Sequence, residues 1–286
     1  MAEALFEEGL FEEGLFEGGG GTSNPFSAYN AKPGPFRLLW LNLVDSAATL
    51  LTPSSSAISV NNIRTRHRKR IWRTTSKTSQ TLTFDLQSTS ENVRCCALTG
   101  YNFTSTATVA IAYSDDGSSW TTIEVKTVGV VTSAFFFFPL QTNRYWRLTF
   151  NDSGNDSPYI EVGRIFLGDY WEPAITVMRG WSLRVVDRSE VKISIGRQKW
   201  TNQKETVTQL SFQLPPQNEV DAIKNFLNIL RRIGLTYDIF LSLMPDASAV
   251  YREATGLYGR FVNITGVGSV SSFAFDTGQI TFEESF

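Results

Sequence analysis

The chain has 286 residues, of which 42% are hydrophobic and 19% are charged, and this apolar content excludes a globally disordered protein. Single hydrophobic cores stop growing near this length, so the sequence predicts two domains. The 26 basic and 28 acidic residues give a net charge of -2, which leaves no field of the whole protein to draw it to nucleic acid or to an anionic membrane.

Only two cysteines occur, Cys95 and Cys96, and adjacent side chains on a strand point to opposite faces. We expect two reduced, packed thiols, which fits assembly in a reducing cytoplasm. The first residues lack a basic segment followed by an apolar core, and no run approaches the roughly eighteen apolar residues of a spanning helix. We therefore expect neither a signal peptide nor membrane insertion.

A near-perfect repeat opens the chain. The motif LFEEG begins at Leu5 and at Leu10, and a shortened copy begins at Leu15. This period matches neither a helix nor a strand, so residues 1–21, which end in a run of glycines, are interpreted as an acidic arm with a flexible hinge. Either the arm is a disordered leader, or it docks into grooves on a neighbouring subunit, as its regular spacing favours. The predicted anchors of a docking arm are Phe6, Phe11 and Phe16.

Residues 22–172 contain many short stretches of β-branched and aromatic residues separated by turn clusters, a pattern typical of a jelly-roll β-sandwich. In the run Phe135–Phe138, alternate side chains must leave the sheet on opposite sides. Two of these rings therefore need a partner outside the sandwich core, in an adjoining domain or subunit. The expected strands are 38–44, 82–86, 93–100, 108–113, 121–126, 133–138, 145–150 and 160–167.

Residues 173–286 are predicted to form a second β domain with one amphipathic helix over about 218–233, ended by Gly234. The fold class is therefore mostly β, with a jelly-roll sandwich first and this second domain after it. The apolar stripe of the helix consists of Val220, Ile223, Leu227 and Leu230, widened by Phe226 and Ile233. The expected strands are 181–187, 191–195, 206–214, 237–243, 258–265, 272–276 and 279–283.

No arrangement of residues points to catalysis. His67 is the only histidine, no cysteine pair has zinc-ligand spacing, and neither a glycine-rich phosphate loop nor a nucleophile elbow occurs. The sequence therefore predicts no enzyme, no metal and no cofactor. A glycan-cleaving enzyme stays open as an alternative, because its two carboxylates can lie far apart along the chain.

Two polar clusters could bind a ligand, but each also has an ordinary structural explanation. Residues 63–73 concentrate basic charge beside Trp72, a pattern that can neutralise phosphates and stack a base. A solvated loop, or an intersubunit contact with acidic residues such as those of the arm, is more typical of such a run in a near-neutral protein, so we expect no nucleic acid partner. The loop at 152–156 has oxygen ligands that suit calcium, but it lacks the closing glutamate of a calcium loop and is interpreted as a turn.

Several motifs between residues 61 and 168 occur in a recognisable order. They are 72–75 (WRTT), 82–86 (LTFDL), 93–103, 113–120 (YSDDGSSW), 144–148 (RYWRL) and 160–166 (IEVGRIF). In this order they resemble a discoidin, or coagulation-factor type C, domain, which is a galactose-binding-like jelly roll. The disulfide that joins the ends of many secreted members is missing, and so are the apolar loop tips that touch membranes, so phospholipid binding is not implied.

The second half, with strands around the helix and then Tyr258-Gly259-Arg260-Phe261, is similar in architecture to distal tail and tail-tip proteins of long-tailed bacteriophages. That resemblance implies a homo-oligomeric ring, commonly a hexamer, that joins the tail tube to the baseplate hub. Its partners would be other tail proteins, namely the tube, the hub and the tape measure. The location would be the virion tail tip, assembled in the host cytoplasm.

The leading hypothesis is thus a structural phage tail-tip protein of the distal tail type that displays a jelly roll. The alternative is a carbohydrate-binding module that attaches the tail to a glycan of the host surface, since sugar sites combine exposed aromatic rings with amides and carboxylates. Packing in the core is the ordinary structural explanation for Trp72 and Trp120. The candidate contacts are Trp72, Trp120, Asn151, Asp152, Asn155 and Asp156.

Overall fold

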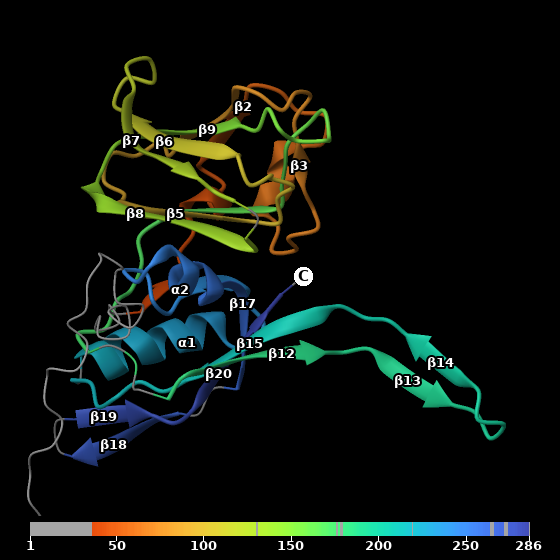
Figure 1. Cartoon of the computed structure of the whole chain (residues 1–286). Coiled ribbons are helices and arrows are strands. Elements are labelled where there is room, and N and C mark those ends of the chain that lie inside the picture. The colour runs from red at the N-terminus through yellow and green to blue at the C-terminus, as the bar shows by residue number, and fades with distance from the viewer. Residues whose placement is uncertain are drawn as a thin grey trace, which may run out of the picture. The chain divides into compact units, whose positions relative to one another are not determined.

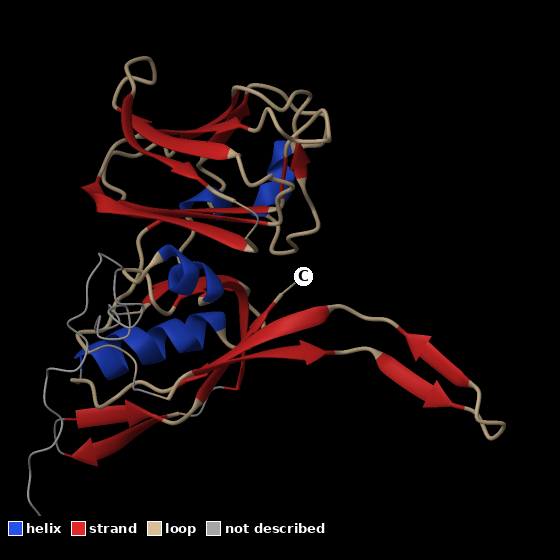
Figure 2. Ribbon diagram, in the orientation of Figure 1, coloured by secondary structure: helices blue, strands red, loops and turns tan. Residues whose placement is uncertain are grey.

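A computed structural model describes residues 36–129, 131–175, 177, 180–218, 220–263, 266–271 and 274–285, which belong to one compact unit. The predicted arm and its anchors Phe6, Phe11 and Phe16 lie outside these residues. The described chain is mostly β, as predicted (Figure 2). None of its helices has the length and apolar character needed to span a bilayer.

Two antiparallel sheets form the sandwich and lie one over the other (Figure 1). Alternate residues of their strands point into a shared core, as Leu82 and Phe84 of one sheet and Leu98 and Phe136 of the other show. The predicted β-sandwich is confirmed. In sheet order, the five-stranded sheet is β2 (Leu50–Pro53), β4 (Gln80–Asp85), β9 (Tyr145–Asn151), β6 (Thr108–Ser114) and β7 (Thr121–Thr127). The three-stranded sheet is β11 (Arg164–Gly168), β5 (Val93–Thr99) and β8 (Ser133–Gln141), and a short pair joins β3 (Trp72–Arg73) to β10 (Glu161–Val162).

A third, six-stranded sheet builds the second part of the molecule. Its first strand comes from before the sandwich, and Trp171 bridges back to Leu38 of that strand where the chain returns. The expected jelly-roll range of 22–172 therefore includes one strand that the structure places in the other sheet. In sheet order the strands are β1 (Arg37–Leu39), β16 (Ile239–Ser242), β17 (Gly256–Asn263), β20 (Ile280–Glu284), β15 (Thr206–Phe212) and β12 (Ser182–Asp187).

The expected strand over 38–44 ends early, at Leu39, and the chain then forms a 3-10 turn at Leu43–Asp45. The reason is Asn42, whose side-chain oxygen accepts the Val44 N–H at 3.1 Å and the Leu167 N–H at 3.1 Å. A side chain that satisfies backbone groups in this way competes with strand pairing. Asn42 thus fastens the connector to β11. A second 3-10 turn covers Val60–Arg64.

The predicted helix is present, as a π-helix (η4, Val220–Leu227) that continues into α1 (Asn228–Ile233), and Gly234 ends it. Phe226, Leu230 and Ile233 are buried as expected, but Val220 is exposed. The stripe is displaced because a π turn holds more residues than an α turn, which rotates the first residues away from the sheet. The remaining elements are the hairpin of β13 (Glu190–Ile193) and β14 (Lys199–Asn202), α2 (Ala249–Ala254), and the hairpin of β18 (Val267–Ser271) and β19 (Ala274–Thr277).

The phenylalanine run on β8 joins the sandwich to the third sheet. Phe136 and Phe138 point into the sandwich core, while Phe135 packs edge-on against Phe240 of β16, with ring centroids 5.9 Å apart. Phe137 packs edge-on against Tyr170 at 5.5 Å. The prediction that alternate rings need a partner outside the sandwich is confirmed. This buried seam consists of Leu39, Cys95, Ala97, Phe135, Phe166, Phe240 and Tyr258.

Gly256 on β17 is the closest approach at this seam. A Cβ atom added there would lie 2.5 Å from Cε2 of Phe135 and 2.9 Å from the Arg252 carbonyl oxygen, whereas one added at Gly196 would meet nothing nearer than 3.9 Å. We expect Gly256→Ala to lower the free energy of unfolding by about 1–3 kcal/mol because the seam is overpacked. Gly196→Ala is the control for denaturant unfolding, and equal effects of the two substitutions would contradict a tight seam.

The two cysteines are free, and they lie on opposite faces of β5, with Cys96 in the sandwich core and Cys95 in the seam. Burial raises the pKa of both thiols, so the reactive thiolate is scarce in the folded protein. Near pH 8 we expect a thiol reagent to leave the native protein unlabelled and to label both cysteines after denaturation. Rapid labelling of the native protein would show that the core or the seam opens readily.

Candidate functional site

A two-stranded ribbon, β13 and β14, projects beyond the edge of the third sheet. β13 and β14 continue the ribbon of β12 and β15 away from the other strands (Figure 1). Every residue of β13 and β14 is exposed. An isolated two-stranded ribbon is at best marginally stable in water, so burial of its apolar side chains would stabilise it.

Both faces of this ribbon carry apolar side chains. Directly opposite residues share a face, so Val191 and Ile193 lie on one face with Thr201 and Lys199, while Trp200 lies on the other, opposite Lys192. Ile193 is 70% exposed and Trp200 is 64% exposed. Exposed apolar surface disfavours the isolated ribbon by about 25 cal/mol per Å². The ribbon can therefore be buried between two partner surfaces.

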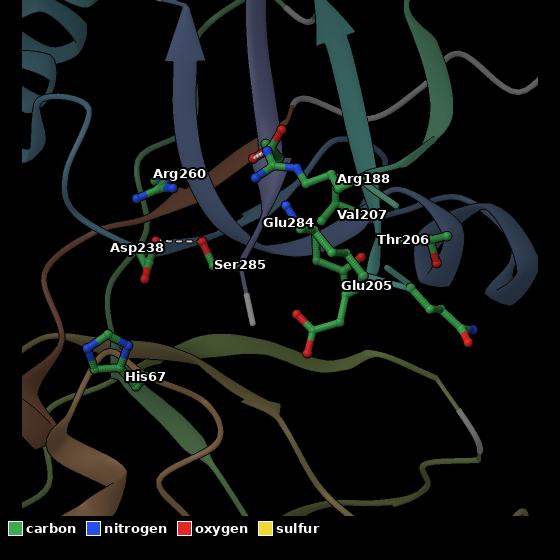
Figure 3. A pocket seen from close by; sticks show the side chains of 12 residues that line it. His67, Arg188, Glu205, Thr206, Val207, Asp238, Arg260, Glu284 and Ser285 are labelled. Atoms are coloured by element: carbon green, nitrogen blue, oxygen red, sulfur yellow. Dashed lines mark hydrogen bonds and ion pairs between the residues drawn. The ribbon is translucent and has the colours of Figure 1, made fainter. Parts of the chain in front are cut away.

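A polar cleft of about 940 Å³ lies between the loop that holds His67 and the third sheet (Figure 3). Its carboxylates already have partners. Glu283 accepts hydrogen bonds from Arg188 and, at 2.6 Å, from Gln209, while Asp238 accepts one from Ser285 at 2.6 Å. Among the described residues, no group of three or more His, Cys, Asp and Glu side chains could hold a metal ion. The carboxylate of Glu283 thus links β20 to Gln209 of β15 and to Arg188.

Of the basic run of residues 63–73, His67 lines this cleft, and most cations of the run are engaged within the chain. Arg68 forms an ion pair with buried Glu284 at 2.9 Å, and Lys69 pairs with Glu205. The guanidinium of Arg66 lies 3.3 Å from the centre of the Tyr237 ring. The acidic partners of this run thus lie in the same folded chain, whereas the sequence favoured a solvated loop or a contact between subunits. Few positive charges of this run are therefore available to bind phosphate.

Trp72 is a core residue. Its ring is fully buried against Phe150, with centroids 5.8 Å apart, and its indole N–H donates to the Ser55 carbonyl oxygen at 3.2 Å. The expected ligand contact at Trp72 is therefore wrong, because a buried ring offers no face to a sugar. Trp120 is different, since it is half-buried and the guanidinium of Arg147 lies 4.2 Å from the centre of its ring. The accessible part of such a ring can pack against a ligand.

The loop at 152–156 is held by two buried polar side chains. Asp152 is 1% exposed and accepts the Thr104 N–H at 2.8 Å and the Thr104 hydroxyl at 2.5 Å. Asn155 is also buried and donates to the Asn102 carbonyl oxygen at 2.9 Å. The expected glycan contacts at Asp152 and Asn155 are therefore wrong, because both side chains are committed to the fold. The interpretation of the loop as a turn fits these bonds.

The remaining candidates do not form one site. Asn151 and Asp156 are exposed. Asn151 pairs with Thr108 at the start of β6, whereas Trp120 lies beyond Tyr113 near its end, through the pairing of Tyr113 with Thr121. At the rise of a strand, these ends are about 17 Å apart. Of the predicted contacts, Trp120 is therefore the one aromatic ring that remains a candidate, at the end of β6 opposite to Asn151.

Two carboxylates at this end of the five-stranded sheet are held by hydrogen bonds. The backbone N–H groups of Ser119 and Ser118 donate to Asp116 at 2.7 and 2.8 Å, which lowers the pKa of that carboxyl. Arg144 donates two hydrogen bonds to Asp85, at 2.7 and 2.9 Å, and lowers the pKa of Asp85. A general acid of a glycosidase needs the opposite shift, so neither group suits that role.

A smaller groove of about 230 Å³ lies between Trp40, Trp171 and the helix. Trp171 stacks on Phe226 with centroids 5.4 Å apart, and the guanidinium of Arg232 lies 5.4 Å from the centre of the Trp40 ring. The indole nitrogen of Trp171 is buried and has no hydrogen-bond acceptor among the described residues. Trp171 lies just before the expected boundary at 172 and is not among the predicted contacts, so its aromatic character was the available signal. We call this site the Trp40–Trp171 groove.

No protein-family model matches the chain, and no curated protein matches it. Among solved structures, a carbohydrate-binding module of Clostridium perfringens, CpGH89CBM32-6, is 21% identical, covers 44% of this chain and 98% of its own, and has a TM-score of 0.39. A second module of that organism, CpGH89CBM32-5, solved with GalNAc-β-1,3-galactose, is 14% identical over 45% of this chain and 100% of its own, with a TM-score of 0.37.

Chitosan-binding module 2 of a Paenibacillus sp. IK-5 chitosanase/glucanase, solved with chitotriose, is 17% identical and covers 45% of this chain and 100% of its own, with a TM-score of 0.38. The predicted discoidin-like, galactose-binding-like jelly roll is thus matched by carbohydrate-binding modules over about 45% of the chain. At these identities the similarity concerns the fold and assigns no ligand to this chain.

The contrast between buried Asp152 and exposed Asp156 is testable. We expect Asp152→Ala to lower the free energy of unfolding by about 1–3 kcal/mol, because the Thr104 and Asn155 donors lose their acceptor. Asp156→Ala should change it by no more than about 0.5 kcal/mol. Thermal or denaturant unfolding measures both variants, and a silent Asp152→Ala would refute its structural role.

Proposed function

We propose that this protein is a structural component of a phage tail tip, of the distal tail type, that assembles as a homo-oligomeric ring and displays the jelly roll. The observation that supports assembly is the ribbon of β12 to β15, which exposes apolar side chains on both faces. A neighbouring copy is the partner that a ring would supply. Ring interfaces are heterologous, so one copy offers the ribbon and the next offers a different, complementary surface.

The seam supports the same role. Rings that join a tube to a hub need subunits whose parts keep their positions, and the buried contacts of Phe135 and Tyr258 fasten the jelly roll to the sheet that carries the ribbon. The Tyr258 hydroxyl also donates to the Arg66 carbonyl oxygen at 2.7 Å. The tail tube, the hub and the tape measure are the further partners in this proposal, and the tail tip of the virion is the location.

The ribbon makes the assembly testable by light scattering of the full chain, whose monomer mass is 32.0 kDa. We expect a multiple of this mass, and we expect Ile193→Asp to reduce it to the monomer, because a carboxylate cannot be buried in an apolar contact without a partner. Asn61→Asp, at an exposed position in the 3-10 turn Val60–Arg64 and away from the ribbon, is the control that adds the same charge. Circular dichroism checks that each variant is folded, and a wild-type monomer at every concentration would contradict the proposal.

A second proposal is that the jelly roll binds a glycan of the host surface. It is supported by the match to carbohydrate-binding modules, two of which were solved with sugars, and by the half-buried ring of Trp120 beside Arg147. Carbohydrates stack on such rings. The comparisons support this role more directly than the tail-tip setting.

A glycan array probed with the full chain tests the second proposal. We expect binding that Trp120→Ala abolishes and that Trp200→Ala, at an exposed tryptophan of the ribbon, leaves unchanged. Absence of binding to every glycan would reject it. Release of reducing ends from a host polysaccharide would instead indicate the third class considered, a glycan-cleaving enzyme.

A further inference from the structure

The Trp40–Trp171 groove combines an apolar floor with a cationic rim. Trp40, Trp171 and Ile229 supply the apolar surface. The charge comes from Lys224 and Arg232, two exposed residues that lie about two turns apart on the helix. Neither cation forms an ion pair among the described residues, where Arg232 contacts the Trp40 ring. The groove therefore fits a ligand with both an aromatic side chain and carboxylates.

The LFEEG repeat of the same protein has this chemistry. Each copy places a phenylalanine directly before glutamate, as in Phe6-Glu7-Glu8 and Phe11-Glu12-Glu13, and no basic residue occurs before Lys32. The arm is thus aromatic and acidic where the groove is aromatic and basic. Charge complementarity of this kind selects partners and speeds their encounter.

We propose that the Trp40–Trp171 groove binds an LFEEG repeat from the N-terminal arm of a neighbouring copy, with a phenylalanine between the two tryptophans and the glutamates on Lys224 and Arg232. This inference rests on the proposed homo-oligomer. The residues from Phe16 to Phe36 span at most about 70 Å, which is enough to cross to an adjacent subunit. Several copies of the motif on one arm raise the effective concentration at a single groove.

Charge reversal tests the assignment in the full chain. Lys224→Glu with Arg232→Glu should weaken assembly, lysine at Glu7, Glu8, Glu12 and Glu13 should do the same, and the combined variant should restore it. Arg70→Glu is the control, because Arg70 is exposed and does not line the groove. Light scattering at low salt gives the mass of each variant, since salt screens exposed pairs. Full assembly of the reversed groove would overturn the proposal.

Disulfide trapping tests which copy supplies the arm. Both native cysteines are buried, so Phe11→Cys in one chain and Asn228→Cys in a co-expressed second chain introduce the exposed thiols. We expect a cross-linked dimer on mild oxidation. A cross-link that forms only within a chain carrying both substitutions would overturn the neighbouring copy as the source.

A peptide experiment separates this inference from the proposed function. A synthetic peptide of residues 5–14 is titrated by calorimetry into the full chain with Phe6, Phe11 and Phe16 replaced by serine. We expect binding that the reversed groove weakens about tenfold or more, as two exposed ion pairs would. No binding while Ile193→Asp still breaks a ring would overturn the groove alone. If the wild-type protein is a monomer but binds the peptide, the groove is supported and the proposed homo-oligomeric ring is rejected.

Discussion

The three-stranded sheet β11–β5–β8 is packed on both of its faces, and the period-two alternation of its strands decides what each face meets. Phe136 and Cys96 belong to the sandwich core, while Phe135 and Cys95, their immediate neighbours, belong to the seam. A shift of one residue in the register of β8 would exchange these two sets. The sandwich and the third sheet therefore constrain one another through a single strand.

Electrostatics reinforces this packing at the edge of the seam. The backbone of Arg68 comes so close to Gly163 that a Cβ atom there would lie 1.8 Å from the Arg68 carbonyl oxygen, and its side chain reaches Glu284 of the third sheet. A buried ion pair contributes little net stability but is costly to break, so it favours one docking geometry over its alternatives. The polar cleft, which Glu284 lines, then follows from the way the sandwich packs on the third sheet.

Local patterns in the sequence predicted most strands, the helix with its Gly234 cap and the two-sided phenylalanine run, because these depend on alternation and capping within a few residues. Long-range pairing escaped prediction. Nothing near residues 37–39 indicates that β1 pairs with β16, some two hundred residues later. Side-chain burial at the candidate site was equally hidden, since Asp152 looks like a solvated turn residue until Thr104 is brought to it by the fold. The exposure of Trp200 likewise depends on where its ribbon lies.

The chain leaves the third sheet after β1 and re-enters it at Trp171, where Leu38 and Trp171 exchange two backbone hydrogen bonds of 2.9 Å. The entry and the exit of the sandwich are thus neighbours, which is the geometry that allows a whole module to be exchanged without disturbing its host. The exchange has one condition. A replacement module needs an apolar surface of its own that covers Phe240 and Tyr258. Recombination at this junction would therefore select modules first by that packing surface and only then by the ligand they bind.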